Sequence, residues 1–265
     1  MTDNKIAQLF KKQPGRSLNV YFTAGFPELE STTTILQTLQ DAGADLVEIG
    51  MPYSDPLADG PTIQQSNTVA LNNGMSIKKL FEQLNNVRDT VTLPIILMGY
   101  LNPVLQFGFE NFCREAARVG VDGLIIPDMP LVEYEEEYQA IFEKYNLSAI
   151  FLITPQTSED RIRRIDALTN AFIYMVSTAS TTGNTVAGTD SQIEYFKRIQ
   201  QMNLKNPKLI GFGISDKKSF DLACRYAEGA IIGSAFIKVI QQPTGLQENI
   251  RDFIYLIKSG EEIFS

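Results

Sequence analysis

The sequence predicts an α/β fold: a (β/α)8 TIM barrel with an extra N-terminal helix, in a single domain that spans residues 1–265. Strand-like and helix-like segments alternate strictly, and each unit runs from strand to helix with a period of roughly 30 residues. No Pro-, Gly- or Ser-rich linker divides the chain. A closed barrel therefore fits better than a doubly wound sheet or two smaller domains.

Eight short apolar segments are the predicted strands. They are residues 18–25, 45–50, 94–100, 122–127, 147–153, 171–177, 207–213 and 228–233. Amphipathic segments between them, opened by a capping or acidic residue, are the predicted helices. The clearest of these are residues 31–43, 110–120, 131–145 and 158–169. The residues before 18 predict the extra helix, which should cover the bottom of the barrel.

Three short glycine motifs recur where a predicted helix leads into a strand: AGAD at 42–45, VGVDG at 119–123 and YAEGA at 226–230. Glycine is the usual residue at the C-cap of a helix, because it adopts a left-handed conformation without a steric penalty. We expect these motifs to cap helices on the face of the barrel that serves stability.

Composition excludes several classes of function. The formal net charge of −8 argues against a nucleic-acid or anionic-membrane binder, since both need a basic face. Cys113 and Cys224 lie far apart with no histidine near them, which predicts structural thiols in a reducing compartment. The N-terminus lacks a signal-peptide core, and no apolar run approaches the ~18 residues that span a bilayer. The sequence predicts a cytoplasmic protein.

Histidine is absent from the chain. This absence removes the usual general base, the common serine and cysteine triads, and the sites that zinc, copper and iron favour. Acid–base chemistry must therefore fall to carboxylates, lysine or tyrosine.

The most informative segment is EIGMPYSDPLADGP at 48–61. Strand alternation places Glu48 on the face opposite to its apolar neighbours Val47 and Ile49. The loop that follows contains three prolines, so it should be stiff and should display Asp55 and Asp59 at the surface. Two carboxylates at the end of a strand and in its loop are suited to acid–base work.

Two other loops follow predicted strands at the same end of the barrel, where active sites of this fold form. Residues 177–190 are rich in Ser, Thr and Gly and predict a mobile lid, with a disordered surface loop as the alternative. GFGIS at 211–215 and IIGSAF at 231–236 end two strands, and Gly233 and Ser234 begin a short helix-like stretch. Free amide groups there would attract a phosphate.

Two other chemistries fit poorly. A Schiff-base lysine should lie near the carboxyl end of a strand, but the predicted strands contain only Lys208, near the start of its strand. A metal site would have to use oxygen ligands such as Asp55, Asp59 or Asp128, and would suit magnesium at best. We expect no metal, and proton transfer by Glu48 with a second carboxylate nearby.

These motifs together resemble the tryptophan synthase α-subunit family. The resemblance covers nearly the whole chain and is carried by YFTAGFP at 21–27, VEIGMPYSDPLADGPTIQ at 47–64, the Asn-Pro pair at 102–103, IPDMP at 126–130, GFGIS and IIGSAF. It implies a retro-aldol cleavage of indole-3-glycerol phosphate to indole and glyceraldehyde 3-phosphate. It also implies that this chain holds no cofactor.

The resemblance implies roles for the two carboxylates. Glu48 would protonate C3 of the indole ring, while Asp59 would bind the ring N–H and stabilise the developing positive charge. The base that takes the glycerol hydroxyl proton stays open, with Glu48 as one candidate. The structural alternatives are a buried, ion-paired Glu48 and an Asp59 that merely forms a turn before Gly60.

The resemblance also assigns binding residues. Those expected to line an indole pocket are Tyr21, Tyr100, Ile125, Tyr174 and Phe212, and without it they would be ordinary barrel filling. The expected phosphate donors are Gly183, Gly213, Gly233 and Ser234. Thr182 belongs to the lid, where Thr178 and Ser180 replace the Arg and first Gly of many relatives.

A partner follows from the same resemblance. The family works with a β subunit that holds pyridoxal phosphate and receives indole through a tunnel, in an α2β2 assembly. Pro52 and Asp55, in the stiff loop, are the expected contacts. Two alternatives remain: another phosphate-binding barrel enzyme, such as a phosphosugar isomerase, and a non-catalytic interaction subunit.

Overall fold

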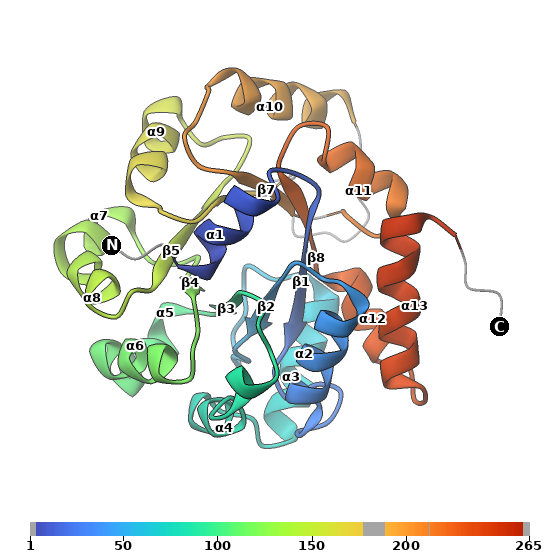
Figure 1. The fold of residues 1–265 in the computed structure, drawn as a ribbon. Helices are drawn as coiled ribbons and strands as arrows, with labels where there is room; N and C mark the ends of the chain where they lie inside the picture. Colours follow the sequence, from blue (N-terminus) through green and yellow to red (C-terminus); the bar gives the residue numbers. More distant parts are fainter. Residues whose placement is uncertain (1–3, 177–188, 212, 262–265) are drawn as a thin grey trace.

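Eight parallel strands close into a barrel in the computed structural model, which describes residues 4–176, 189–211 and 213–261 (Figure 1). They are β1 (Ser17–Thr23), β2 (Leu46–Gly50), β3 (Ile95–Met98), β4 (Gly123–Ile125), β5 (Ser148–Ile153), β6 (Ile173–Val176), β7 (Lys208–Gly211) and β8 (Gly229–Ile232). The strands follow one another in order, and β8 pairs with β1 to complete the ring. The predicted (β/α)8 barrel is confirmed.

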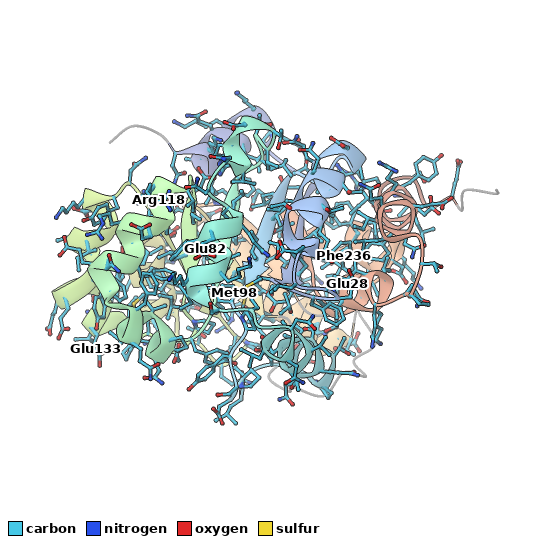
Figure 2. All side chains as sticks on the ribbon, turned by 90° about the horizontal axis from the view of Figure 1, so that it is seen from below. Glu28, Glu82, Met98, Arg118, Glu133 and Phe236 are labelled. Atoms are coloured by element: carbon cyan, nitrogen blue, oxygen red, sulfur yellow. The ribbon has the colours of Figure 1, made fainter. Side chains whose placement is uncertain are left out.

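Helices surround the barrel and connect its strands (Figure 1). They are α1 (Lys5–Lys12), α2 (Ser31–Ala42), α3 (Pro61–Asn72), α4 (Ile77–Gln83), η1 (Val87–Asp89), α5 (Leu101–Phe107), α6 (Phe109–Arg118), α7 (Leu131–Glu133), η2 (Tyr134–Tyr138), α8 (Gln139–Lys144), α9 (Glu159–Leu168), α10 (Asp190–Gln201), α11 (Lys217–Ala223), α12 (Ser234–Ile240) and α13 (Leu246–Ser259). Side chains such as Arg118 and Glu133 lie on the outer helices, with Met98 further in (Figure 2).

The predicted helix at 131–145 is divided in the structure. It begins as α7, passes through the π-helical turn η2 and ends as α8. Ser158 caps α9 as expected, since its side chain accepts a hydrogen bond from the Arg161 amide. The first residues of α2 and α6 receive no side-chain cap. The capping residues in the sequence therefore predicted the positions of these helices correctly, but a side-chain cap forms at α9 and not at α2 or α6.

Helix α1 lies across the amino-terminal opening of the barrel, as the sequence predicts (Figure 1). Its Ile6 and Phe10 side chains pack into the interior cluster, where Phe10 meets the ring of Phe172. The Asn4 side chain caps the helix through the Ala7 amide and also donates to the carbonyl of Asp122. Helix α1 thus closes the barrel from below.

Two apolar clusters divide the core. One lies between the strands and the outer helices, and the other fills the barrel interior with side chains from α1 and from the strands β2 to β8. Leu46 of β2 belongs to the interior cluster, so alternation places Glu48 on the same inward face. Ser17 and Asn19 of β1 are fully buried as well. The interior is thus apolar around most of the ring and polar where β1 meets β2.

The predicted glycine caps divide into two groups. Gly43 and Gly120 follow α2 and α6 with φ of 92° and 85°, in the left-handed region that favours glycine. The prediction was wrong for YAEGA, because Gly229 belongs to β8 itself. A Cβ at Gly229 would lie 2.0 Å from the carbonyl oxygen of Ser17. Glycine is needed there for the close approach of β8 to β1, and not for a helix cap.

The two cysteines are free thiols. Burial raises the pKa of Cys113 to about 12 and that of Cys224 to about 11, so neither is activated as a nucleophile. Among the residues that the structure describes, no helix is long and apolar enough to cross a membrane.

Candidate active site

Glu48 is a fully buried carboxylate inside the barrel. It lies in β2, where its backbone pairs with Tyr21 of β1 and Ile96 of β3. The amide Nδ2 of Asn19 donates to Glu48 Oε1 at 2.5 Å, while Oε2 has no hydrogen-bond partner among the described residues. Burial raises the pKa of Glu48 to about 8, and the Asn19 hydrogen bond opposes that rise.

The surroundings of Glu48 decide whether it is a buried structural acid in an ion pair. No cation contributes to its pKa, and no described lysine or arginine forms an ion pair with it. A carboxyl group buried without a countercharge holds its proton at neutral pH. Such a group is suited to donating a proton, and the ion-paired reading of Glu48 does not fit.

Asp59 lies in the loop between β2 and α3, which the following helix holds in place. Pro61 begins α3, with Gly60 as its N-cap. From α3, the Gln64 side chain donates to the backbone carbonyls of Pro56 and Asp59 at 3.4 and 2.9 Å. Asn67 accepts a hydrogen bond from the Tyr53 amide. The loop that carries Asp59 is thus fixed at both ends to its own helix.

Tyr100 fixes the same loop from the neighbouring strand. It follows β3, and its hydroxyl donates to Asp59 Oδ2 at 3.1 Å and accepts from the Ala58 amide at 3.1 Å. Its ring lies 5.2 Å from the ring of Tyr53. Burial raises the pKa of Asp59 to about 6, and the Tyr100 hydrogen bond opposes the rise. Asp59 is therefore mostly ionised at neutral pH.

A small cavity of about 40 Å³ lies beside Asp59 at the carboxyl end of the barrel. Of the residues predicted for the site, it brings together Asp59, Tyr21 and Tyr100. Its other lining residues are Met51, Ala58, Asn67, Met98, Gly99, Pro127 and Leu152. Sequence reasoning missed these, although alternation along the predicted strands would have indicated inward positions for Met98 and Leu152.

The remaining predicted pocket residues are not among those that line this cavity. Ile125 and Tyr174 belong to the interior cluster. Burial raises the pKa of the Tyr174 phenol, and the nearby charges of Glu48 and Asp59 raise it further. A Cβ at Gly211 would lie 2.4 Å from the Tyr174 hydroxyl, so that glycine makes room for the ring. Phe212 lies outside the described residues.

Three of the expected phosphate residues, Gly213, Gly233 and Ser234, follow β7 and β8 at the same end of the barrel as the cavity. Gly233 is the N-cap of α12 and Ser234 is its first residue, exposed to solvent. A Cβ at Gly233 would lie 3.6 Å from the ring of Tyr21, a lining residue of the cavity. Gly213 is exposed and has a φ of 74°. Gly183 and Thr182 lie outside the described residues.

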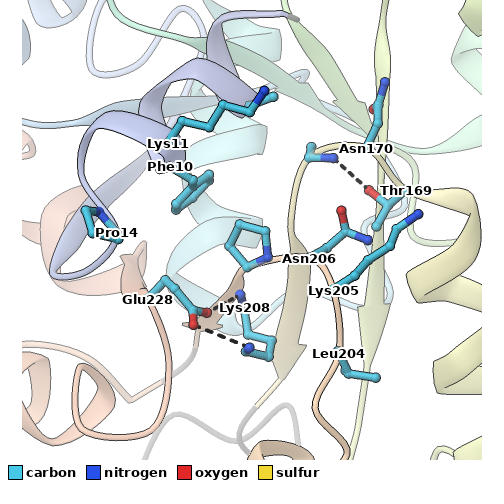
Figure 3. Close-up of a pocket in the computed structure, with 13 residues that line it drawn as sticks. Phe10, Lys11, Pro14, Thr169, Asn170, Leu204, Lys205, Asn206, Lys208 and Glu228 are labelled. Carbon is cyan, nitrogen blue, oxygen red and sulfur yellow. Dashed lines mark hydrogen bonds and ion pairs between the residues drawn. The ribbon is translucent and has the colours of Figure 1, made fainter.

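A larger cavity, of about 540 Å³, lies at the opposite end, between α1 and the starts of β6 and β7 (Figure 3). Its charged groups are largely engaged: Lys208 pairs with Glu228, and Lys205 reaches the Ala167 carbonyl. Catalytic residues of this fold gather at the carboxyl ends of the strands. The smaller cavity, which Asp59 lines, is therefore the candidate active site, and Glu48 is buried in β2 outside its lining.

The stiff loop presents a surface away from the cavity. Asp55 is exposed, Pro52 is half-buried, and Leu57 is 86% exposed, which is high for a leucine. The Ser54 hydroxyl donates to the Asp55 carboxylate. An ordered loop that displays a large apolar side chain is a feature of docking surfaces.

Comparison with known proteins identifies relatives. Residues 7–262 match the sequence model of the family described as "Tryptophan synthase alpha chain". A tryptophan synthase alpha chain of Flavobacterium psychrophilum is 56% identical over 235 residues, which is 89% of this chain and 92% of that protein.

Solved structures agree. The crystal structure of tryptophan synthase subunit alpha from Legionella pneumophila has a TM-score of 0.87 and 30% identity, over 96% of this chain and 97% of that one. A chain from the tryptophan synthase complex of Pyrococcus furiosus has a TM-score of 0.83 and 32% identity, over 91% and 97%.

Proposed function

The chain belongs to the tryptophan synthase alpha chain family, and on that premise we propose that Glu48 and Asp59 carry out the family's reaction at the carboxyl end of the barrel. The chain is a carbon–carbon lyase, which cleaves indole-3-glycerol phosphate to indole and glyceraldehyde 3-phosphate. It holds no cofactor, and indole passes to a β subunit that holds pyridoxal phosphate. The phosphosugar isomerase and the non-catalytic subunit are not favoured.

The observation that carries the assignment is the difference between the two carboxyl groups. The pKa of Glu48 is about 8 and that of Asp59 about 6, so at neutral pH the first is mainly protonated and the second mainly ionised. Two acids whose environments separate their pKa values mark the donor and the charge-stabilising partner. Glu48 then gives its proton to C3, and Asp59 accepts the ring N–H as positive charge develops.

The substrate's two ends have separate sites in this proposal. Tyr21, Tyr100 and the apolar lining of the cavity receive the indole ring, and Ile125, Tyr174 and Phe212 are assigned to the same ring. The amides of Gly233 and Ser234 bind the phosphate, together with Gly213, Gly183 and the lid residue Thr182. In support, Gly233 lies directly beside the Tyr21 ring.

Binding the ring requires the site to open. A cavity of about 40 Å³ has room for about one water molecule. An indole ring therefore does not fit the cavity as it stands, and some of the lining must move when the ring enters. The substrate in turn supplies Asp59 with a new hydrogen-bond donor in place of the Tyr100 hydroxyl.

We also propose a partner contact, a single domain and a cellular location for the chain. Pro52 and Asp55 contact the β subunit in an α2β2 assembly, supported by the order and exposure of their loop. Residues 1–265 form one domain, supported by the continuous barrel and its helices. The protein is cytoplasmic, supported by its two free, buried or half-buried thiols.

An assay of indole release tests the proposed function. The purified chain, alone and with a β subunit, is given indole-3-glycerol phosphate, and indole is followed by absorbance. We expect indole and glyceraldehyde 3-phosphate in equal amounts, with turnover that survives chelation and borohydride treatment. Absence of indole, or turnover that requires magnesium, would overturn the assignment.

A further inference from the structure

Asn19 is the one described side chain that holds the Glu48 carboxyl group. It lies in β1 on the inward face, two residues before Tyr21, and is fully buried. Its Nδ2 donates to Glu48 Oε1 at 2.5 Å. A glutamate side chain has three rotatable bonds, so a single strong hydrogen bond at its end decides where its two oxygens lie.

The contact leaves one carboxyl oxygen available for chemistry. With Oε1 held by Asn19, Oε2 is buried and has no partner among the described residues. A buried oxygen without a partner is costly and calls for an explanation. An oxygen left free in this way is the one that can exchange a proton with a substrate atom.

Asn19 is also suited to both protonation states of Glu48. Its Oδ1 is buried and has no partner among the described residues. An amide carries a donor at one end and an acceptor at the other. Its donor Nδ2 serves an ionised carboxylate and equally a protonated carboxyl group whose hydrogen lies on Oε2, because Oε1 is then the carbonyl oxygen and still accepts.

We propose that Asn19 is a positioning residue for Glu48: it holds one carboxyl oxygen in both protonation states, so that the other oxygen delivers the proton to the substrate. The inference rests on the proposed function and deepens it. In the forward step the O–H bond of Glu48 breaks, a C–H bond forms at C3 of the indole ring, and the Asn19 amide donates to the carboxylate that remains.

Few other groups influence Glu48. The titratable groups that interact with it are Tyr21 from β1 and Tyr174 from β6, and Asp59 acts on the same two tyrosines from the loop after β2. Burial raises the pKa of both phenols, so they stay neutral. From β3, the backbone partner of Glu48 is the apolar Ile96. A change in the titration of Glu48 on substitution of Asn19 therefore reports the loss of this contact.

The test compares Asn19→Leu with Ser17→Ala. Asn19→Leu keeps a similar volume and removes the donor, and Asn19→Asp keeps the shape if leucine disturbs the fold. Ser17→Ala is the matched control: Ser17 lies on the same strand and face, is fully buried, and its hydroxyl has no partner among the described residues. Glu48 is titrated by carbon-13 NMR of labelled glutamate carboxyls without substrate, and its signal is assigned by its loss in Glu48→Gln.

We expect Asn19→Leu to raise the pKa of Glu48 by about one to two units, the size of a lost hydrogen bond to a charged group. Turnover should fall by ~10-fold or more with little change in KM, and the pH profile of kcat should move in the same direction as the NMR titration. Asn19→Asp should raise the pKa too, because a second carboxylate disfavours ionisation of the first. Ser17→Ala should leave both measurements unchanged.

An unchanged Glu48 titration in both Asn19 variants, or an equal shift in Ser17→Ala, would overturn the inference. The effect of Asn19 on the Glu48 carboxyl group and the catalytic role of Glu48 are measured separately. Near-normal turnover in Glu48→Gln would overturn the catalytic role of Glu48 and with it the positioning role. The NMR titration needs no substrate and still measures whether Asn19 sets the charge of that carboxyl group.

Discussion

Tyr100 holds Asp59 across the mouth of the barrel. Its hydroxyl donates to Asp59 Oδ2 at 3.1 Å and accepts from the neighbouring Ala58 amide at the same distance. The two residues come from loops that follow different strands, β3 and β2. One phenol therefore sets both the position of the Asp59 loop and the direction of its carboxylate.

We predict that Tyr100→Phe raises the pKa of Asp59 above about 6, because the substitution removes a hydrogen bond that stabilises the ionised carboxylate. A limb of the pH–kcat/KM profile that requires ionised Asp59 should move upward by about one unit, and kcat/KM at neutral pH should fall by about two-fold. Steady-state rates across a pH series measure both. Tyr53→Phe, which keeps the ring against Tyr100, is the control, and an identical profile in Tyr100→Phe would contradict the prediction.

Glu48→Gln should fold normally and lose at least ~10²-fold in turnover, the lower range for a general acid–base group. Glutamine keeps the shape of the side chain and can still meet the Asn19 amide, but it has no proton to give. Indole release is compared with that of Glu82→Gln, the same change at an exposed site on α4. Near-normal cleavage by Glu48→Gln would remove Glu48 from the mechanism.

The same substitution should affect stability in a pH-dependent way. The folded pKa of Glu48, about 8, lies above its ordinary value of 4.5, so its contribution to stability is full below 4.5 and is lost as pH rises through 8. As pH rises from 4.5 to 8, the unfolding free energy of the wild type should fall, relative to that of Glu48→Gln, by about 1.4 kcal/mol per pH unit. Urea unfolding from pH ~5 to ~9 measures the difference, with Glu82→Gln as control. A difference independent of pH would mean that Glu48 is not protonated when buried.

Gly233→Asp should raise the KM for the phosphorylated substrate by ~10-fold or more, because like charges ~4 Å apart repel strongly in a partly buried site. The fold should tolerate the change. Gly233 has a φ of −118°, and an added Cβ would meet its nearest atoms at 3.6 to 3.8 Å. Gly233→Ala introduces the same carbon without charge and serves as the control. Equal KM values for the two variants would place the phosphate elsewhere.

The isolated chain should release indole slowly, and its β partner should accelerate it by well over ~10-fold, because a partner that binds the loop before Asp59 also acts on the site that this loop carries. Asp55→Ala and Pro52→Ala should weaken this activation more than they weaken the unaided reaction, because both residues lie in the displayed loop. Activity titrations with the β subunit, run beside size-exclusion chromatography, measure this. Asp41→Ala, an exposed aspartate on α2, is the control. Full activation of all three variants would exclude the loop as the contact.

Local pattern was enough to predict the barrel. Each strand alternates toward one interior and each helix has one apolar face, so the eight β/α units could be recognised one at a time. The sequence pattern misled at Gly229. It lies between a helix and a strand, where a capping glycine is expected, but it makes room for the backbone of another strand. No local signal carries the distance between β8 and β1.

The candidate site was predicted in its parts and missed in its contacts. Glu48 and Asp59 were identified because acids at a strand end and in a stiff loop are unusual. The hydrogen bond of Asn19 to Glu48 joins residues 29 positions apart, and that of Tyr100 to Asp59 joins residues 41 positions apart. Both bonds therefore depend on how neighbouring strands are aligned. Strand register arises only when the barrel closes, so composition and periodicity could not supply these pairs.

Helix α1 closes the amino-terminal end of the barrel. Ile6 and Phe10 fill the amino-terminal end of the barrel. Glu48 lies between that end and the mouth and is fully buried. Once a substrate covers the mouth, the carboxyl hydrogen of Glu48 can no longer exchange with the surrounding water. With Glu48 as the donor, the hydrogen isotope that appears at C3 of the released indole is the one that Glu48 acquired before the substrate arrived. The product thus carries an isotopic record of the buried acid and not of the solvent at the moment of cleavage.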